Sequence, residues 1–237
     1  MKTICATLVA GILLVAAERR GMAAEPQTAE ELAPETPSAQ PVATASPPAE
    51  PSKLPVYAEV GLGFGKTLFF GDTKEALRKS YGGAFDPGTG TNLMIGFIAA
   101  PTSWHGVGVG ARIKGTFGSP VKGDNNDDYI FNYYALSLAV KAYPFAKTFN
   151  DGPYARVSAG FGQMTTKRQN EATNLYRHQY AIGLTAAGAL GYTLPVGRFG
   201  LGLEVEFEYS DRTGTADGIG STTYQSGQLG GNFVLSF

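Results

Sequence analysis

The chain has 237 residues, and its 19 lysine and arginine residues are balanced by 20 aspartate and glutamate residues. This balance excludes a strongly basic protein that binds nucleic acid through bulk charge. A single cysteine, Cys5, excludes a disulfide scaffold and a cysteine-based zinc site. Only two histidines are present. We therefore expect no metal, no cofactor and no nucleic-acid partner.

Residues 1–24 have the pattern of a secretory signal peptide. Lys2 precedes a run of fourteen mostly apolar residues that ends at Ala17, which is too short to span a bilayer core of roughly 30 Å. Small residues allow cleavage after Ala17 or after Ala24, and the sequence does not choose between them. An uncleaved anchor is the alternative interpretation.

Residues 25–55 differ from the rest in composition. They hold 8 of the 14 prolines and no aromatic residue, whereas residues 56–237 hold 30 of the 32 glycines. Such a proline-rich segment buries too little apolar surface to offset the entropy lost on ordering. We expect a disordered linker that acts as a solvated spacer; a tether to another envelope component is the alternative.

Apolar residues alternate with small or charged residues throughout residues 56–237. In the first segment Val60, Leu62 and Phe64 alternate with glycines. A period of two predicts β-strands. Eight segments show it, at about residues 56–65, 93–99, 107–117, 134–140, 155–162, 180–192, 199–209 and 229–237.

The face that points inwards separates a soluble barrel from a membrane barrel. The non-apolar face is rich in glycine and alanine, whereas a soluble surface would carry many lysine, glutamate, serine and threonine residues. A narrow lumen needs small residues to leave room for long charged ones. Aromatic residues also cluster at the ends of the apolar faces, as in the girdles of transmembrane barrels. They are Tyr134, Tyr180 and Tyr209 at one rim and Tyr192, Phe199 and Phe237 at the other.

The connections alternate in length, as they do in outer-membrane barrels with periplasmic turns and external loops. The short ones are 101–106, 144–153 and 194–198, and the long ones are 67–91, 118–128, 166–178 and 211–223. Within the first long connection, Asp72 and Glu75 predict a capped helix that reaches Tyr81. The sequence thus predicts an all-β fold, an eight-stranded antiparallel up-and-down transmembrane barrel with both termini in the periplasm.

The last segment resembles the C-terminal signal of Gram-negative outer-membrane barrels, with alternating apolar residues at Leu229, Phe233, Leu235 and Phe237. Residues 56–237 resemble the OmpA-like transmembrane domain and its small-barrel relatives. The resemblance implies insertion by the barrel-assembly machinery, contact with outer-membrane lipid and lipopolysaccharide, and loops available to an extracellular ligand. In that family a peptidoglycan-binding domain, when present, follows the barrel. This sequence stops at Phe237, so we do not expect peptidoglycan binding from the resemblance.

Charged residues on the inner face sort into two layers. Strands four apart face each other across an eight-stranded barrel. The lower layer then pairs Glu59 with Arg156, and Lys141 lacks an evident partner. The upper layer consists of Arg112, Lys114, Glu204, Glu206 and Glu208. The resemblance implies that this layer obstructs the lumen, so that its loss raises conductance; solvation by lumen water is the alternative.

The predicted function is a structural or surface-interaction role with four extracellular loops. A small gated channel is the alternative, and a lipid A-modifying enzyme is a third interpretation. An esterase needs a nucleophile beside a base, and the candidates near one rim are His178, Ser210 and Ser226. His105, beside Trp104, fits an interfacial turn better, so we predict no catalytic residues.

One further motif suggests a ligand. The acidic and amide side chains of residues 124–128 could bind calcium weakly. A solvated loop tip explains the same residues, so we predict no metal site.

Overall fold

The computed structural model describes residues 54–82, 86–124, 127–146, 148–170, 175–216 and 220–237. The predicted signal peptide and nearly all of the predicted linker lie outside the described residues, as do Asn125 and Asn126.

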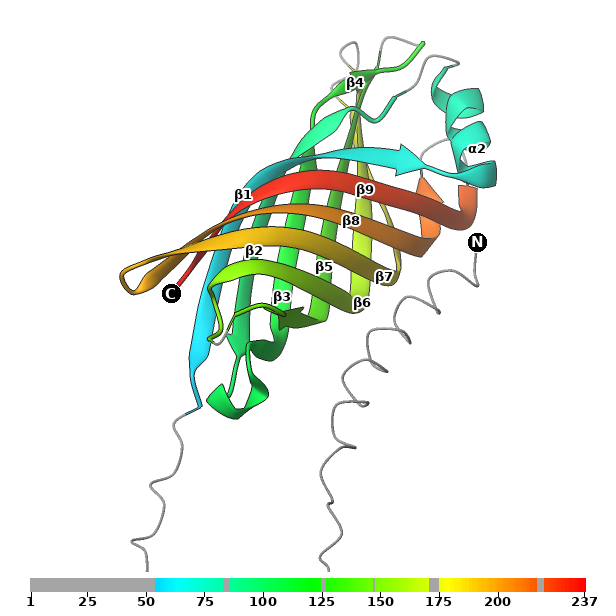
Figure 1. The fold of residues 1–237 in the computed structure, drawn as a ribbon. Helices are drawn as coiled ribbons and strands as arrows, with labels where there is room; N and C mark the ends of the chain where they lie inside the picture. Colours follow the sequence, from blue (N-terminus) through cyan, green and yellow to red (C-terminus); the bar gives the residue numbers. More distant parts are fainter. Residues whose placement is uncertain (1–53, 83–85, 125–126, 147, 171–174, 217–219) are drawn as a thin grey trace, which may run out of the picture. The chain divides into compact units, whose positions relative to one another are not determined.

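Eight long strands form a closed antiparallel barrel (Figure 1). They are β1 (Val56–Phe69), β2 (Thr89–Ala99), β3 (Val107–Gly118), β5 (Asp128–Ala142), β6 (Gly152–Asn170), β7 (Leu175–Val196), β8 (Phe199–Ala216) and β9 (Gly220–Ser236). Barrel strands that follow one another in sequence are paired, and β1 also pairs with β9, which closes the barrel. The short strand β4 (Val121–Lys122) pairs only with the start of β5. The predicted up-and-down barrel is confirmed.

Apolar side chains point away from the barrel and polar side chains fill it. On β1, Leu62 and Phe64 are 54% and 69% exposed, whereas Glu59 is 3% exposed. Inward-facing glycines leave space for long side chains: a Cβ atom at Gly162 would lie 2.8 Å from a guanidinium nitrogen of Arg212. This arrangement is the reverse of a soluble barrel, as the sequence predicts.

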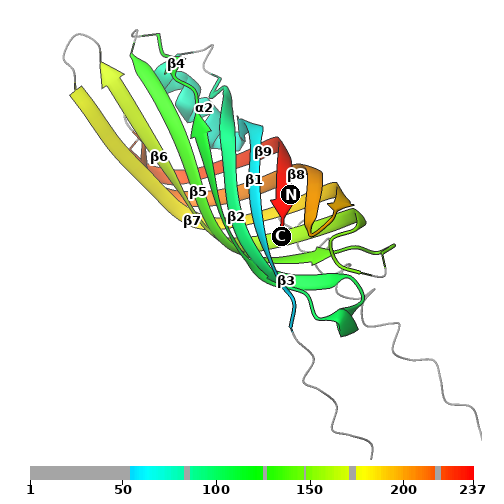
Figure 2. The same cartoon turned by 90° about the vertical axis from the view of Figure 1, so that its left-hand side faces the viewer.

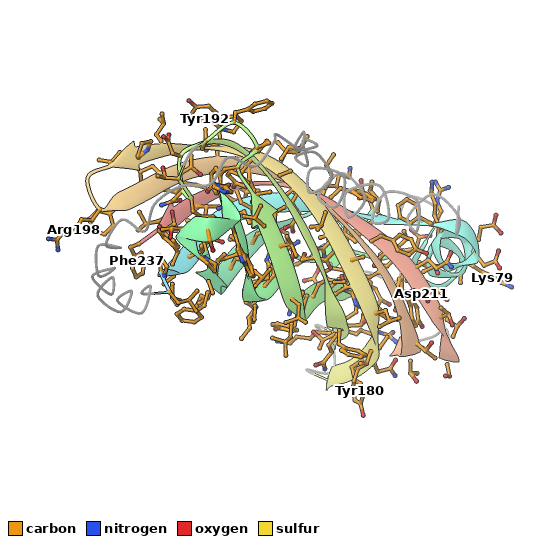
Figure 3. All side chains as sticks on the ribbon, turned by 60° about the horizontal axis from the view of Figure 1, so that its bottom comes forward. Lys79, Tyr180, Tyr192, Arg198, Asp211 and Phe237 are labelled. Carbon is orange, nitrogen blue, oxygen red and sulfur yellow. The ribbon has the colours of Figure 1, made fainter. Side chains whose placement is uncertain are left out.

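Outward-facing aromatic residues lie near both ends of the barrel. Phe199 and Phe237 are half exposed, with ring centroids 6.4 Å apart. In Figure 3, Arg198 and Phe237 lie at one end, and Lys79 lies at the other. We call the end that holds Arg198 and Phe237 the turn end, and the end that holds Lys79 the helix end.

Two of the four predicted long loops are largely strand. β6 continues to Asn170 and β7 begins at Leu175, while β8 continues to Ala216 and β9 begins at Gly220. These paired strand ends extend past the band of outward-facing apolar side chains, which we call the apolar belt. Backbone pairing continues there, but no apolar face marks the strands in the sequence. At the turn end, two residues join β7 to β8, and Gly197 adopts a φ of 62° that favours glycine.

Helix α2 (Gly71–Tyr81) occupies the predicted place, but the predicted capping box is wrong. The helix begins at Gly71, so its N-cap is Phe70, two residues before the predicted cap, and Phe70 makes no side-chain capping bond, while Asp72 lies in the first turn. In Figure 2, α2 and β4 lie at the same end of the barrel.

The other described helix is the short 3₁₀ helix η2 (Thr102–Trp104) at the turn end. In the described part of the chain, no helix has the length and apolar character needed to span a membrane.

Thr73 connects α2 to the free edge of β9. Beyond its last pair with β1, the β9 backbone at Thr223 and Gln225 lacks a neighbouring strand on that side. The Thr73 hydroxyl donates to the Thr223 carbonyl oxygen at 3.2 Å, and the Gln225 N–H donates to the same hydroxyl oxygen at 3.0 Å. The side chain therefore takes the place of a strand partner and holds the helix at the barrel mouth.

Candidate functional site

The candidate site is the barrel interior. Among the described residues, nine charged side chains on the barrel strands are at most 5% exposed. They are Glu59, Arg112, Lys114, Lys141, Arg156, Glu204, Glu206, Glu208 and Arg212. All seven charged residues predicted to line the lumen are in this set. Alternation places them inside, because residues two apart on one strand share a face.

Glu206 lies at the centre of the charged set. Its carboxylate oxygens lie 2.5 Å from Arg112 Nη1, 2.6 Å from Lys114 Nζ and 2.5 Å from Arg156 Nη2. Two of these cations come from β3, on the opposite wall from β8. A buried carboxylate is costly unless it is paired, and here three cations from two strands share it.

The charged network continues toward the helix end through Glu208. Its carboxylate accepts hydrogen bonds from Lys114 Nζ at 3.0 Å and from Arg212 Nη2 at 3.2 Å. Arg212 Nη1 also donates to the Ser226 hydroxyl at 3.2 Å. The network thus spans several levels of the barrel.

The pairing toward the turn end differs from the prediction. Arg156 binds Glu204 at 2.7 Å, whereas Glu59 binds Lys141 at 2.5 Å. The prediction that Lys141 lacks a partner is therefore wrong. Lys141 sits on β5 and Glu59 on β1, which are not the opposed strands of the four-apart rule; the long lysine side chain crosses the space between them.

Two apolar clusters lie above and below the charged network. The helix-end cluster contains Phe69, Leu77, Tyr81, Tyr129, Phe131, Tyr133, Met164, Ala181 and Tyr224. Its rings are packed closely, with centroids 4.1 Å apart between Tyr81 of α2 and Tyr129 of β5. Because its members come from α2 and from strands on several sides of the barrel, the cluster fills the mouth.

The turn-end cluster contains Ile98, Ala100, Tyr143, Phe149 and Tyr154. The ring centroids of Tyr143 and Phe149 are 4.9 Å apart, and Tyr143 lies within hydrogen-bond distance of Thr193 on β7, at 3.1 Å. This cluster fills the opposite end. Between the clusters lies a cavity of about 10 Å³ lined in part by Arg112 and Lys114, which is roughly the size of one water molecule.

Among the described side chains, no hydrogen bond joins a histidine to Ser210 or Ser226. Ser210 donates to Glu208 at 3.2 Å and to Thr185 at 3.0 Å inside the barrel. Ser226 accepts from Arg212. His105 is exposed at the turn end, and the side chain of His178 lies outside the described residues.

Two of the three described acidic residues of the predicted calcium-binding loop form ion pairs. Asp127 binds Arg168 at 2.5 Å, and Asp128 binds Lys122 at 3.3 Å. Across the described ranges, no three His, Cys, Asp or Glu side chains are grouped as a metal site.

Sequence reasoning missed Arg212 and the two apolar clusters. Arg212 has the same parity as Glu204, Glu206 and Glu208, so extending the alternation of β8 would have found it. The sequence predicts a loop over residues 211–223, and this range contains Arg212. The clusters depend on how α2 and the turns fold back over the barrel, for which strand periodicity carries no signal.

We compared the sequence and the fold with those of known proteins. No protein-family model matches the sequence, and no curated protein matches it. A structure of Ail, the attachment invasion locus protein of Yersinia pestis, in complex with the heparin analogue sucrose octasulfate, is similar with 13% identity and a TM-score of 0.50. The match covers 77% of this chain and 99% of that chain.

Two further solved structures match with lower TM-scores. Neisserial surface protein A is 11% identical, with 77% of this chain and 97% of that chain covered and a TM-score of 0.45. A backbone structure of the Yersinia pestis outer membrane protein Ail in a phospholipid bilayer nanodisc is 16% identical. That match covers 75% of this chain and 98% of that chain, with a TM-score of 0.36. At these identities the likeness concerns the fold: the barrel strands of this chain form the eight-stranded fold of small outer-membrane β-barrels.

Proposed function

We propose that the protein is a non-conducting barrel of the outer membrane with a structural or surface-interaction role. The outward-facing apolar belt and the aromatic residues at both ends favour a bilayer as its surroundings. In this proposal the helix end lies outside the cell. The turn end lies in the periplasm with both termini, since β1 begins and β9 ends there.

The observation that carries the proposal is the filling of the lumen at three successive levels. The helix-end cluster, the charged network and the turn-end cluster each draw side chains from several strands. Eight strands enclose a space that side chains can fill. An ion crossing the barrel would have to displace aromatic rings twice and separate buried ion pairs once, and this disfavours the gated channel.

A surface-interaction role is supported by the elements gathered at the helix end. Helix α2, strand β4 and the extended ribbons β6–β7 and β8–β9 all lie there. The similar barrel Ail was solved with a heparin analogue bound, and by analogy we propose that this end meets an extracellular ligand. Insertion by the barrel-assembly machinery through the β9 residues from Leu229 to Phe237 belongs to the same proposal, as does a spacer role for the linker in the periplasm.

Envelope fractionation combined with planar-bilayer recording tests the proposal. The mature protein should fractionate with the outer membrane and migrate faster on a gel when it is not boiled, as folded barrels do. Purified monomer should give no steady openings. Recovery in the inner membrane, or steady single-channel openings of the unaltered protein, would contradict the proposal.

A further inference from the structure

The buried charges inside the barrel do not balance. Among the described residues, the nine buried charged side chains of the barrel strands comprise five cations and four carboxylates. The cations are Arg112, Lys114, Lys141, Arg156 and Arg212, and the carboxylates are Glu59, Glu204, Glu206 and Glu208. This part of the interior therefore carries one positive charge in excess. A buried charge without compensation is costly, so the excess favours a bound anion.

Part of the excess charge lies on the guanidinium of Arg112. Its Nη1 donates to Glu206 at 2.5 Å, but Glu206 is shared with Lys114 and Arg156. Within the described part of the chain, Nε and Nη2 of Arg112 are buried and have no hydrogen-bond partner. Arginine only donates hydrogen bonds, so these two groups need an acceptor.

Arg112 lines the cavity of about 10 Å³ inside the barrel. Small side chains on three successive strands leave this space, namely Ser137 of β5, Ser158 of β6 and Ala187 of β7. The strand register brings these residues together, since Arg112 pairs with Ser137 and Ser158 pairs with Ala187. The cavity can hold a single group of about the size of one water molecule.

Hydrogen-bond donors surround the cavity. The hydroxyl groups of Ser137 and Ser158 can each donate a hydrogen. The ammonium of Lys114 also lines the space, and its bonds to Glu206 and Glu208 use two of its three hydrogens. A group that only accepts hydrogen bonds therefore matches this lining.

The carboxylate of Glu208 also lines the cavity, but its charge is compensated. It accepts hydrogen bonds from Lys114 at 3.0 Å, from Arg212 at 3.2 Å and from Ser210 at 3.2 Å. These three donors hold both of its oxygens. The charged groups at the cavity are thus two cations and one carboxylate, and the positive excess persists locally.

We propose that this cavity binds one monatomic anion such as chloride, held by Arg112 and the hydroxyl groups of Ser137 and Ser158. Chloride accepts hydrogen bonds and donates none, and its charge cancels the excess of the network. A water molecule fits the same space but leaves that excess uncompensated. Sulfate and phosphate are larger than the space. The inference goes beyond the proposed function, because an interior site does not depend on which end of the barrel faces the cell exterior.

Anomalous X-ray scattering from bromide tests the site in the unaltered mature protein. Bromide has the charge of chloride and nearly its size, and its absorption edge distinguishes it from water. Because apolar clusters fill both ends of the barrel, bromide is supplied while the protein refolds and during crystallisation. We expect an anomalous peak in the cavity, within hydrogen-bond distance of the Arg112 guanidinium. Density in the cavity without an anomalous signal would identify water and would overturn the inference.

The dependence of stability on chloride gives a second test. Urea unfolding in lipid vesicles compares chloride with gluconate, an organic anion too large for the cavity, at equal ionic strength. A ligand that binds only the folded state lowers the unfolding equilibrium constant. With chloride at about 100 mM and a Kd of about 10 mM, that constant should be roughly tenfold smaller in chloride than in gluconate.

Two matched variants separate the cavity from the bulk solution. Ser158→Val removes a lining hydroxyl and fills the space with an additional methyl group. Thr166→Val is the control, because it removes another buried hydroxyl from the inward face of the same strand but leaves the cavity unchanged. Faster migration without boiling first confirms that each variant folds.

The chloride dependence should disappear in Ser158→Val and persist in Thr166→Val. Equal dependence in the parent and both variants would show that chloride acts outside the cavity, and no dependence in the parent would show that the folded barrel binds none. Either result would overturn the inference. The bromide experiment needs no variant, so it decides the question even if Ser158→Val fails to fold.

Discussion

Lys141 and Glu59 form an ion pair of 2.5 Å in which the side chains are 1% and 3% exposed. The ammonium of Lys141 also lies 4.0 Å from the centroid of the Tyr154 ring. The pair therefore joins the charged network to the turn-end cluster. Because neither group meets solvent, each depends on the other for compensation of its charge.

A double-mutant cycle on this pair should reveal strong coupling. Replacing only one partner, in Glu59→Gln or Lys141→Met, leaves the other charge buried and should lower the free energy of unfolding by about 3–5 kcal/mol. The double variant should lose much less than the sum of the two. Urea unfolding in lipid vesicles measures all three variants.

The exposed pair of Lys122 and Asp128 serves as the control for that cycle. Its atoms are 3.3 Å apart and the Lys122 side chain is 54% exposed, so the coupling there should be about 0–1 kcal/mol. Additive losses at Glu59 and Lys141 would contradict the role given to their ion pair.

Glu206→Gln should be among the most destabilising single changes in the barrel. The neutral amide leaves Arg112, Lys114 and Arg156 facing one another without their shared carboxylate. We expect a loss of about 3–5 kcal/mol, seen as a lower temperature at which the fast-migrating folded band disappears. Glu75→Gln on the exposed face of α2 should leave that temperature nearly unchanged; an equal shift in both variants would speak against the network.

Removing two cations of the charged network should not open the barrel to ions. The family resemblance implies that Arg112→Ala with Lys114→Ala raises conductance, but apolar clusters also fill both ends. We now predict that this double variant stays silent in planar bilayers and that adding Tyr81→Ala and Tyr143→Ala yields openings. Steady openings of the double variant would show that the clusters do not close the lumen.

The hydroxyl of Thr73 should decide whether α2 stays on the barrel. Thr73→Val removes both hydrogen bonds to β9 while keeping the side-chain shape, and Thr73→Ser retains the hydroxyl. Amide exchange in α2 should become roughly ten- to a hundredfold faster in the valine variant, since each hydrogen bond contributes about 1 kcal/mol. The serine variant should exchange like the parent. Unchanged exchange in both would mean that the Phe70–Gln225 backbone hydrogen bond and the packing of Leu77 and Tyr81 hold the helix without the hydroxyl.

The strands could be predicted because their signal is local. Alternation along β1 or β8 reports directly which face is apolar, and a closed barrel leaves each strand two such faces. The ends of β6 and β8, near Asn170 and Ala216, were not predicted as strand because both of their faces lie beyond the apolar belt. With no apolar face to bury, sequence periodicity no longer marks the strand.

The sequence predicts which charged residues line the barrel interior, but it does not predict which of them form ion pairs. Parity places Arg156 and Lys141 inside the barrel, yet strand tilt and side-chain length decide which carboxylate each reaches. Lysine spans several ångströms, so Lys141 reaches Glu59 on a strand that the four-apart rule does not oppose to it. The filling of the barrel mouth depends on the course of α2 between Phe70 and Gly82, which is a tertiary feature.

Labelling of single cysteines in intact cells tests the central claim most directly, because it asks which end of the barrel meets the exterior. Lys79 of α2 and Arg198 of the β7–β8 turn lie at opposite ends (Figure 3). The parent protein is the background control, since its one cysteine, Cys5, lies in the predicted signal peptide. A membrane-impermeant maleimide should label Lys79→Cys in intact cells and Arg198→Cys only after the outer membrane is permeabilised. Labelling of Arg198→Cys but not Lys79→Cys in intact cells would contradict the account.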